Sequence, residues 1–491
     1  MSSTLIIGLI VAYFCILIFI SYLTSRNTDS DTFFLANRNS PWYVVAFGMI
    51  GTSLSGVTFV SIPGMVAAAQ FSYLQLVLGY LLGYFVIATV LMPMYYRLNL
   101  VSIYTYLEDR FGYWSYKTGA AFFLLSRTLG AAIRLFLVAG VLQLAVFNDL
   151  GVPFSVSVVI TILLIWVYTF RGGMKTIIWT DTFQTAAMLL AVATSIWLIS
   201  DELNLGFQGL IDTVQASEYS QVFFWDVKDS KYFLKQFFSG AFIAIVMTGL
   251  DQDMMQKNLS CKNIGEAQKN MFWFSIILVF VNILFLALGA LLYIYANAKG
   301  IALPTRGDDV FPFLALNHFT YFAGIVFILG IIAITYASAD SALTALTTSF
   351  CVDFLDFKNK TEQERVRIRY IVHAGISLVM VVVIIVFDIL NNQNVITAVF
   401  KVAGYTYGPL LGLYAFGLYT KRAVRDRFVP AVCVIAPLLT LIISFNSVDW
   451  FWGYEFGFEV LILNGFLTFV GLMGISTGRI DELELAQEQT V

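Results

Sequence analysis

Two clusters of oxygen-bearing residues interrupt the long apolar stretches of this chain. The first, Phe47 to Gly64, reads FGMIGTSLSGVTFVSIPG and holds four glycines, a proline and several hydroxyls. The second, Ile334 to Ser341, reads ITYASADS and includes the carboxylate of Asp340. Hydroxyl, carbonyl and carboxylate oxygens are the donors that hard cations prefer. These residue types therefore point to cation binding in an apolar environment.

The first cluster predicts a helix that is interrupted partway along its length. Its hydroxyls gather at one depth rather than at a strict four-residue spacing, on Thr52, Ser53, Ser55 and Thr58. Unwound backbone inside a membrane is tolerated only where it is buried or lines a cavity, and its free carbonyls can then ligate a cation. The alternative is a face of small residues packed closely against a neighbouring helix.

The second cluster contains an ionisable group within an apolar segment. An ionised side chain there costs about 2.5–3.5 kcal/mol on the mildest scale, so Asp340 requires a partner. That partner is either a bound cation or a basic side chain, Lys401 or Arg134. Hydroxyls alone are weaker evidence, because serine and threonine often bond back to their own helix. The residues that share one helical face in this segment are Ile334, Ala337, Ser338 and Ser341.

A further carboxylate, Asp181, follows the turn RGGMK and begins an apolar segment. Taken alone, it is explained as an N-terminal charge satisfied by the helix dipole and by Arg171 or Lys175.

The composition predicts an all-α polytopic membrane protein. Of 491 residues, 59% are hydrophobic and only 12% are charged. An outer-membrane barrel would show short alternating segments, whereas a helix satisfies its own backbone in lipid. About 13 stretches are long enough to span a bilayer. They are 4–23, 42–70, 74–98, 117–147, 152–170, 177–200, 232–249, 271–297, 320–350, 366–389, 395–419, 428–446 and 457–475.

Basic residues between these stretches predict the orientation. With the N-terminus outside, 20 lysines and arginines fall in inside loops and helix ends, Lys257 among them, and 5 fall outside. The other three, Arg127, Arg134 and Lys401, lie deeper in predicted spans. The positive-inside rule then places the C-terminus in the cytoplasm. We expect the chain to lie in the cell (plasma) membrane, the inner membrane of a cell that has two.

Several functional classes are disfavoured. The net charge of −3 supplies no basic patch for nucleic acid. There is no G-x-x-x-x-G-K-[ST] loop, so any uphill work must draw on an ion gradient. A membrane-embedded enzyme would need a catalytic constellation, yet the two histidines, His318 and His373, fall near opposite membrane faces. We therefore expect no enzyme activity.

Several motifs resemble the sodium:solute symporter family, which includes sodium/glucose and sodium/sialic acid cotransporters. The stretch GGMKTIIWTDTFQ, 172–184, resembles the family signature. Other pieces agree in order, from about residue 31 to 423. They are DTFFLANRNSPW (31–42), TYLEDRFG (105–112), QDMMQKNLSCKNIGEA (252–267) and GYTYGPLLGLYAFGLYTKRA (404–423).

The resemblance implies a leucine-transporter-like core of 5+5 inverted repeats. It divides the chain into an extra N-terminal helix and cytoplasmic loop (1–41), a first repeat (42–200), an extracellular loop (201–231), a second repeat (232–419), two C-terminal helices (420–475) and an acidic cytoplasmic tail (476–491).

The resemblance also implies a primary sodium site between the first and eighth core helices. Carried over residue by residue, its ligands are the carbonyls of Gly51, Leu54, Ile334 and Ala337 and the hydroxyl of Ser338. Members commonly place a second hydroxyl where this chain has Ala337, so the site has one ligand fewer or recruits water.

Some members carry a second sodium site, whose positions here are Asp181, Asp340 and Ser341. Asp340 departs from the serine usual in such relatives. A carboxylate there strengthens a sodium site, accepts a proton or pairs with Lys401, so the sodium count stays open.

The implied function is sodium-coupled import of a small polar solute by alternating access, with Na+ as coupling ion and the lipid bilayer as surroundings. An anionic substrate, such as a sugar acid or other carboxylate, follows from Arg134 and Lys401; uncharged sugars, amino acids, polyols and vitamins stay open. An ion channel or a membrane-embedded sensor on the same fold is the alternative. The oligomeric state is not given by the sequence, and a monomer is the working expectation. The expected cavity residues are Ser53, Ser55, Thr58, Tyr73, Gln75, Arg134 and Lys401.

Overall fold

A computed structural model describes residues 3–24, 38–100, 102–169, 174–355, 360–390 and 395–479. The acidic tail beyond residue 479 and most of the loop expected to be cytoplasmic, 25–37, therefore lie outside the described residues, as do Arg171 and the side chain of Lys175.

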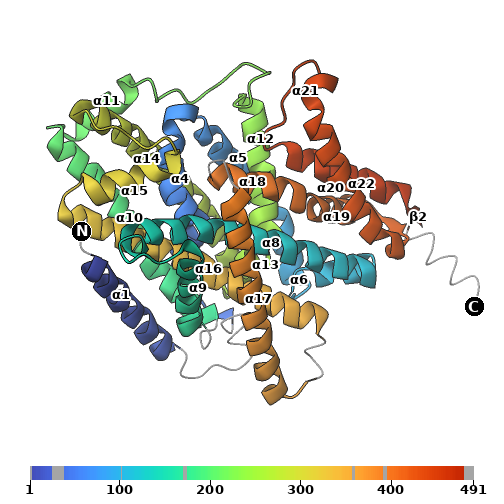
Figure 1. The fold of residues 1–491 in the computed structure, drawn as a ribbon. Helices are drawn as coiled ribbons and strands as arrows, with labels where there is room; N and C mark the ends of the chain where they lie inside the picture. The colour runs from blue at the N-terminus through green and yellow to red at the C-terminus, as the bar shows by residue number, and fades with distance from the viewer. Residues whose placement is uncertain are drawn as a thin grey trace, which may run out of the picture.

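Helices make up nearly all of the described chain, as expected for an all-α protein (Figure 1). The first half contains α1 (Ser3–Thr24), α3 (Trp42–Leu54), α4 (Gly56–Ala69), α5 (Tyr73–Val86), the π-helical turn η2 (Ile87–Leu91), α6 (Met92–Arg97), α7 (Thr105–Arg110), α8 (Tyr113–Leu142), the π-turn η3 (Gln143–Phe147), α9 (Phe154–Thr169), α10 (Met174–Glu202) and α11 (Phe207–Ala216).

The second half contains α12 (Phe233–Ala244), the π-turn η4 (Ile245–Gly249), α13 (Gln252–Leu259), α14 (Ile264–Lys299), α15 (Gly307–Asn317), α16 (Tyr321–Phe354), α17 (Glu362–Leu390), α18 (Val395–Thr406), α19 (Gly408–Tyr419), β1 (Arg422–Val424), the 3-10 turn η6 (Asp426–Phe428), α20 (Val429–Phe445), α21 (Ser447–Trp450), α22 (Val460–Gly474) and β2 (Ser476–Arg479). The two strands pair antiparallel, with Arg422 opposite Arg479.

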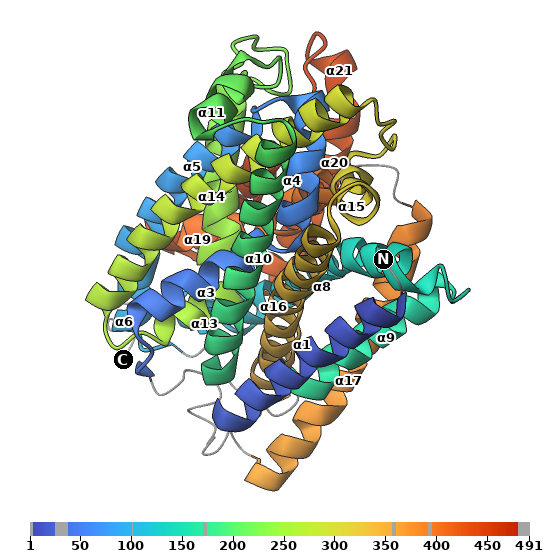
Figure 2. The ribbon, with the colours of Figure 1, turned by 90° about the vertical axis from the view of Figure 1, so that its left-hand side faces the viewer.

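Each of the thirteen expected spans overlaps a helix of the structure. Within the described ranges, seven helices are long and apolar enough to cross a membrane, or up to nine if each of two bent pairs counts as one span. Five shorter apolar helices, including Phe154–Trp166 and Val460–Gly474, account for the remaining stretches. In both views α11 and α21 lie at one end of the molecule and the start of α17 at the other (Figures 1 and 2).

The predicted interruption of the first core helix is confirmed. α3 ends at Leu54 and α4 begins at Gly56, with a bend of 56° between them. Ser55 at the bend has φ 17° and ψ 170°, outside the helical region. Serine–glycine pairs are common kink sites, because neither residue fills the space that the bend requires.

A second interruption was not predicted. α12 and η4 meet α13 at a bend of 67°. Asp251 caps α13, accepting hydrogen bonds from the backbone of Asp253 at 3.0 Å and Met254 at 3.4 Å. Every residue of α13 is buried. Lys257, which the sequence places among the inside loops and helix ends, therefore lies on a buried helix.

The centre of the molecule is built around α16, which is one uninterrupted helix. Its residues from Gly330 to Ser349 are all buried. α16 packs against α10, which in turn packs against α3. Figure 2 shows these helices side by side with α13 below the middle of the molecule. The two polar clusters found in the sequence thus meet in the interior.

Candidate sodium and solute site

At Gly48 and Gly51 the broken helix packs against its neighbours with no side chain of its own. A Cβ atom built on Gly51 would overlap the hydroxyl of Thr185 and lie 3.4 Å from Cδ1 of Ile334. A Cβ on Gly48 would lie 3.2 Å from the carbonyl oxygen of Ile178. Glycine at these positions therefore permits the close packing of α3 against α10 and α16.

The expected ligands of the primary sodium site lie on two packed helices, Gly51 and Leu54 on α3 and the other three on α16. Leu54 is the last residue of α3, and the last four carbonyls of a helix have no partner within it. Ile334 and Ala337 are fully buried on α16. Ser338 is 4% exposed, and its hydroxyl forms no hydrogen bond with the described residues.

The expected second site holds a basic side chain. Nζ of Lys257 lies 2.7 Å from Oδ2 of Asp181 and 2.9 Å from Oγ of Ser341. It also donates to the hydroxyl of Thr52 at 2.6 Å, which donates in turn to Asp181 at 2.9 Å. The Asp181 and Lys257 side chains are 0% and 1% exposed. Thus Asp181 is a buried ion-pair partner rather than a helix-end charge.

Asp340 belongs to the same group of charges. Its Oδ1 accepts a hydrogen bond from the backbone of Ser341 at 2.5 Å, and its charge acts on Lys257. Lys401, which was offered as its basic partner, is instead exposed on α18. The expected pairing of Asp340 with Lys401 is therefore wrong, whereas its pairing with a bound cation stays a prediction.

A second ion-pair network adjoins this group. Arg127 of α8 pairs with Asp253, and its other terminal nitrogen lies 3.6 Å from Asp251. Tyr407 donates to Asp251 at 3.0 Å. Asp253 lies 3.8 Å from Lys257 and so links the two networks. None of Lys257, Asp251 and Asp253 was singled out from the sequence, although three charges within seven residues of an apolar chain were a usable signal.

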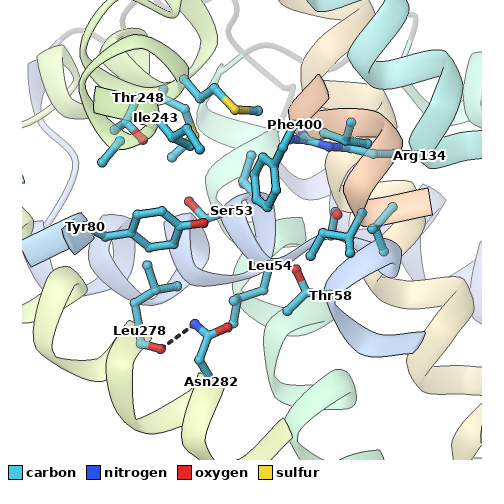
Figure 3. Close-up of a pocket in the computed structure, with 18 of the residues that line it drawn as sticks. Ser53, Leu54, Thr58, Tyr80, Arg134, Ile243, Thr248, Leu278, Asn282 and Phe400 are labelled. Atoms are coloured by element: carbon cyan, nitrogen blue, oxygen red, sulfur yellow. Dashed lines mark hydrogen bonds between the residues drawn. The ribbon is translucent and has the colours of Figure 1, made fainter. Parts of the chain in front are cut away.

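A cavity of about 700 Å³, open solvent included, lies beside the helix break (Figure 3). Five of the seven expected solute-binding residues line it: Ser53, Ser55, Thr58, Tyr73 and Arg134. Figure 3 shows Ser53 and Tyr80 on one side and Arg134 and Phe400 on another. Asn282 donates to the carbonyl of Leu278 at 2.7 Å, and its own buried Oδ1 has no partner among the described residues.

Two arginines line the cavity, and only one of them is paired with carboxylates in the described part of the chain. Arg127 is paired with carboxylates, as described above. Arg134 lines the same cavity and forms no ion pair with any described residue. A guanidinium presented to a cavity in this way can bind a carboxylate through two parallel hydrogen bonds.

The other two expected solute-binding residues lie elsewhere. Gln75 donates to the carbonyl of Lys231 at 2.9 Å and accepts from the backbone of Phe224 at 3.2 Å. It therefore ties the start of α5 to the loop before α12. The exposed side chain of Lys401 lies outside the cavity lining, although its neighbour Phe400 is part of it.

Comparison with known proteins adds the family. The model of the sodium:solute symporter family matches residues 33–426. The chain is 26% identical over 487 residues to the sodium/sialic acid symporter NanT of Aliivibrio fischeri, covering 95% of this chain and 93% of that protein. It is 23% identical to the sodium/sialic acid symporter SiaT of Proteus mirabilis, with 84% of each covered.

Solved structures agree on the fold. A Na+-coupled sialic acid symporter in a substrate-bound, outward-open state superposes with a TM-score of 0.79 at 19% identity, covering 95% of this chain and 96% of that one. The transporter Mhp1 of the nucleobase-cation-symport-1 family superposes with a TM-score of 0.56 at 14% identity, covering 91% and 96%. Because the family model matches most of its length, the chain belongs to the sodium:solute symporter family.

Proposed function

We propose that this chain imports a small carboxylate, either a sugar acid such as sialic acid or another organic acid, together with sodium. Membership of the family makes it a sodium-coupled transporter of small solutes rather than an enzyme. The observation that carries the choice of an anion is Arg134, a cavity-lining guanidinium without an ion-pair partner among the described residues.

The remainder of the cavity suits a hydroxylated solute. The hydroxyls of Ser53, Thr58 and Tyr80 line it, and the orphaned Oδ1 of Asn282 would accept a hydrogen bond from a solute hydroxyl. Two of the relatives are sialic acid symporters, which adds support for an acidic sugar.

The sodium site proposed here lies where α3 ends against α16. Its ligands are the carbonyls of Gly51, Leu54, Ile334 and Ala337 and the hydroxyl of Ser338. The C-terminal end of a helix carries partial negative charge, which favours a cation at the end of α3. Ala337 contributes no hydroxyl, so a water completes the shell or the site works with five oxygens.

Sodium in this position would couple to the solute through the broken helix. It would fix α3 against α16, and α3 also presents Ser53 to the cavity, so each ligand would raise the affinity for the other. One cation crossing with 100 mV gains about 2.3 kcal/mol. A tenfold sodium gradient adds about 1.4 kcal/mol, so one sodium would support roughly 500-fold accumulation of a neutral solute. A monoanion cancels the charge of the one sodium that it crosses with, so only the gradient acts and the accumulation would be roughly tenfold.

The membrane arrangement follows the positive-inside pattern. We propose thirteen spans in the plasma membrane, with the N-terminus outside and the C-terminus in the cytoplasm. Residues 42–200 and 232–419 would form the two inverted repeats, and the functional unit would be a monomer. The superposition on a sialic acid symporter over 95% of the chain supports this arrangement of helices.

Uptake into proteoliposomes tests the proposed function. The purified chain is reconstituted and offered labelled sialic acid, uronic acids, monocarboxylates, neutral sugars and amino acids, with inward gradients of sodium or potassium. We expect saturable, sodium-dependent accumulation of an acid. Uptake of a neutral solute only would refute the choice of an anion.

A further inference from the structure

The ammonium of Lys257 occupies a complete set of hydrogen-bond acceptors. A lysine ammonium has three N–H donors. Three oxygens lie within 2.9 Å of Nζ: Oδ2 of Asp181, Oγ1 of Thr52 and Oγ of Ser341. These distances are those of ordinary to strong charge-assisted hydrogen bonds. The ammonium is therefore held as a bound cation would be held.

The oxygens come from the helices that also form the proposed sodium site. Thr52 is on α3, next to Gly51, and Ser341 is on α16, three residues or about one helical turn after Ser338. Asp181 is on α10, and Lys257 reaches them from α13. The ammonium thus joins four helices at a position adjacent to the primary ion site.

The surrounding charges also suit one resident cation. The carboxylates of Asp181 on α10 and Asp253 on α13 lie 2.7 and 3.8 Å from Nζ of Lys257. On the side of Asp253, Arg127 supplies the nearest other positive charge. Oδ1 of Asp181 has no hydrogen bond with the described residues, but a single oxygen is no coordination shell, since hard cations such as calcium take about six to eight.

We propose that the Lys257 ammonium is a tethered cation in place of a second sodium, so that the chain binds and carries one sodium per solute. This inference rests on the proposed function for its primary sodium site. A second sodium at Asp181 and Ser341 would have to share the oxygens that Lys257 already uses, with two like charges at hydrogen-bond distance. The ammonium therefore closes this site to sodium.

Counting bound sodium on the purified full-length protein tests the proposal. Equilibrium binding of radioactive sodium is measured for the wild type and for Lys257→Met, which removes the charge and keeps an apolar stem. We expect one sodium in the wild type, with a Hill coefficient of about 1, and a second sodium in Lys257→Met, with a coefficient rising toward about 2. Two sodium ions in the wild type, or one in a folded Lys257→Met, would overturn the proposal.

Matched variants separate the charge from the packing. Lys257→Arg keeps the cation and is expected to bind one sodium. The double variant Asp181→Asn with Lys257→Met removes both charges and is expected to bind one as well. If Lys257→Met does not fold, sodium binding to Asp181→Asn is measured instead. One bound sodium in both the wild type and this variant supports the inference, and a fall from two in the wild type to one in the variant overturns it.

The same measurement distinguishes the two proposals from each other. A wild type that binds no sodium overturns the proposed function, and this inference with it. A wild type that binds two sodium ions, one of them lost in Asp181→Asn, overturns the tethered cation alone and leaves sodium-coupled uptake intact.

Discussion

Replacement of Arg134 by alanine tests how the cavity selects its solute. Arg134 lines the cavity and forms no ion pair within the described part of the chain, so its removal strands no partner charge. The variant should therefore fold, and its defect should appear in the half-saturating concentration of the solute rather than in stability.

The expected magnitude follows from the bonds that a carboxylate would make. A guanidinium donates two parallel hydrogen bonds to a carboxylate, each worth about 1.5 kcal/mol or more because both groups are charged. Two such bonds amount to about 3 kcal/mol, or roughly a 100-fold rise in the half-saturating solute concentration. Arg134→Lys keeps the charge but cannot donate two parallel hydrogen bonds, so its half-saturating solute concentration should lie between those of the wild type and Arg134→Ala. Initial rates of uptake at saturating sodium measure the effect.

Lys401 provides the matched control. It is a basic residue of the same predicted set, but its side chain is exposed and lies outside the cavity lining. Lys401→Ala should leave solute affinity unchanged. Equal effects of Arg134→Ala and Lys401→Ala, or no effect of Arg134→Ala, would refute the assignment of Arg134 as the carboxylate anchor.

Two further substitutions test the packing. Gly51→Ala places a methyl group against the hydroxyl of Thr185, and such overpacking typically costs about 1–3 kcal/mol. We expect a lower thermal midpoint and weaker sodium activation, partly restored by adding Thr185→Ala; an unaltered midpoint would contradict the close approach. Gln75→Ala removes hydrogen bonds to the loop before α12, at about 1–3 kcal/mol for the buried groups left unpaired. The thermal midpoint of this variant should fall while its solute affinity stays constant. A loss of solute affinity at an unchanged midpoint would show instead that Gln75 contacts the solute.

The break in the first core helix was predictable because its causes are local. Ser55 and Gly56 are adjacent, and glycines at 48 and 51 remove side chains from the same stretch. Hydropathy likewise located the apolar segments, since each spans a bilayer by its own composition. The neighbourhood of Gly51 and Ile334 followed from the family resemblance, which supplied the pairing of helices that no local pattern contains.

The Lys257 site was not predictable in the same way. Its partners Asp181 and Ser341 lie 76 and 84 residues away along the chain. The hydropathy pattern places Lys257 directly after an apolar span, among the loops and helix ends. Such a pattern does not indicate which polar segments fold back into the protein interior. The charges of α13 become tolerable only through ion pairs with α8 and α10, and such pairs exist only in three dimensions.

The choice between Gln75 and Arg134 as cavity residues has a similar origin. Both are polar residues in apolar helices, and both were expected to reach the solute. Gln75 does not reach the cavity because its side-chain amide is hydrogen-bonded to the loop at Lys231 and Phe224. Gln75 lies 156 and 149 residues from these two loop residues along the chain, so neither segment alone could predict the contact.

Sodium activation of uptake in Ser338→Ala tests the central claim most directly. The hydroxyl of Ser338 forms no hydrogen bond with the described residues, so its loss should remove a sodium ligand rather than a structural bond. Thr347→Ala is the control, because that hydroxyl lies on the same helix and bonds to the carbonyl of Leu343 at 2.7 Å. We predict that Ser338→Ala raises the half-activating sodium concentration by about tenfold or more, the equivalent of roughly 1.4 kcal/mol, while Thr347→Ala does not. An unchanged sodium activation curve in Ser338→Ala would contradict a sodium site between α3 and α16.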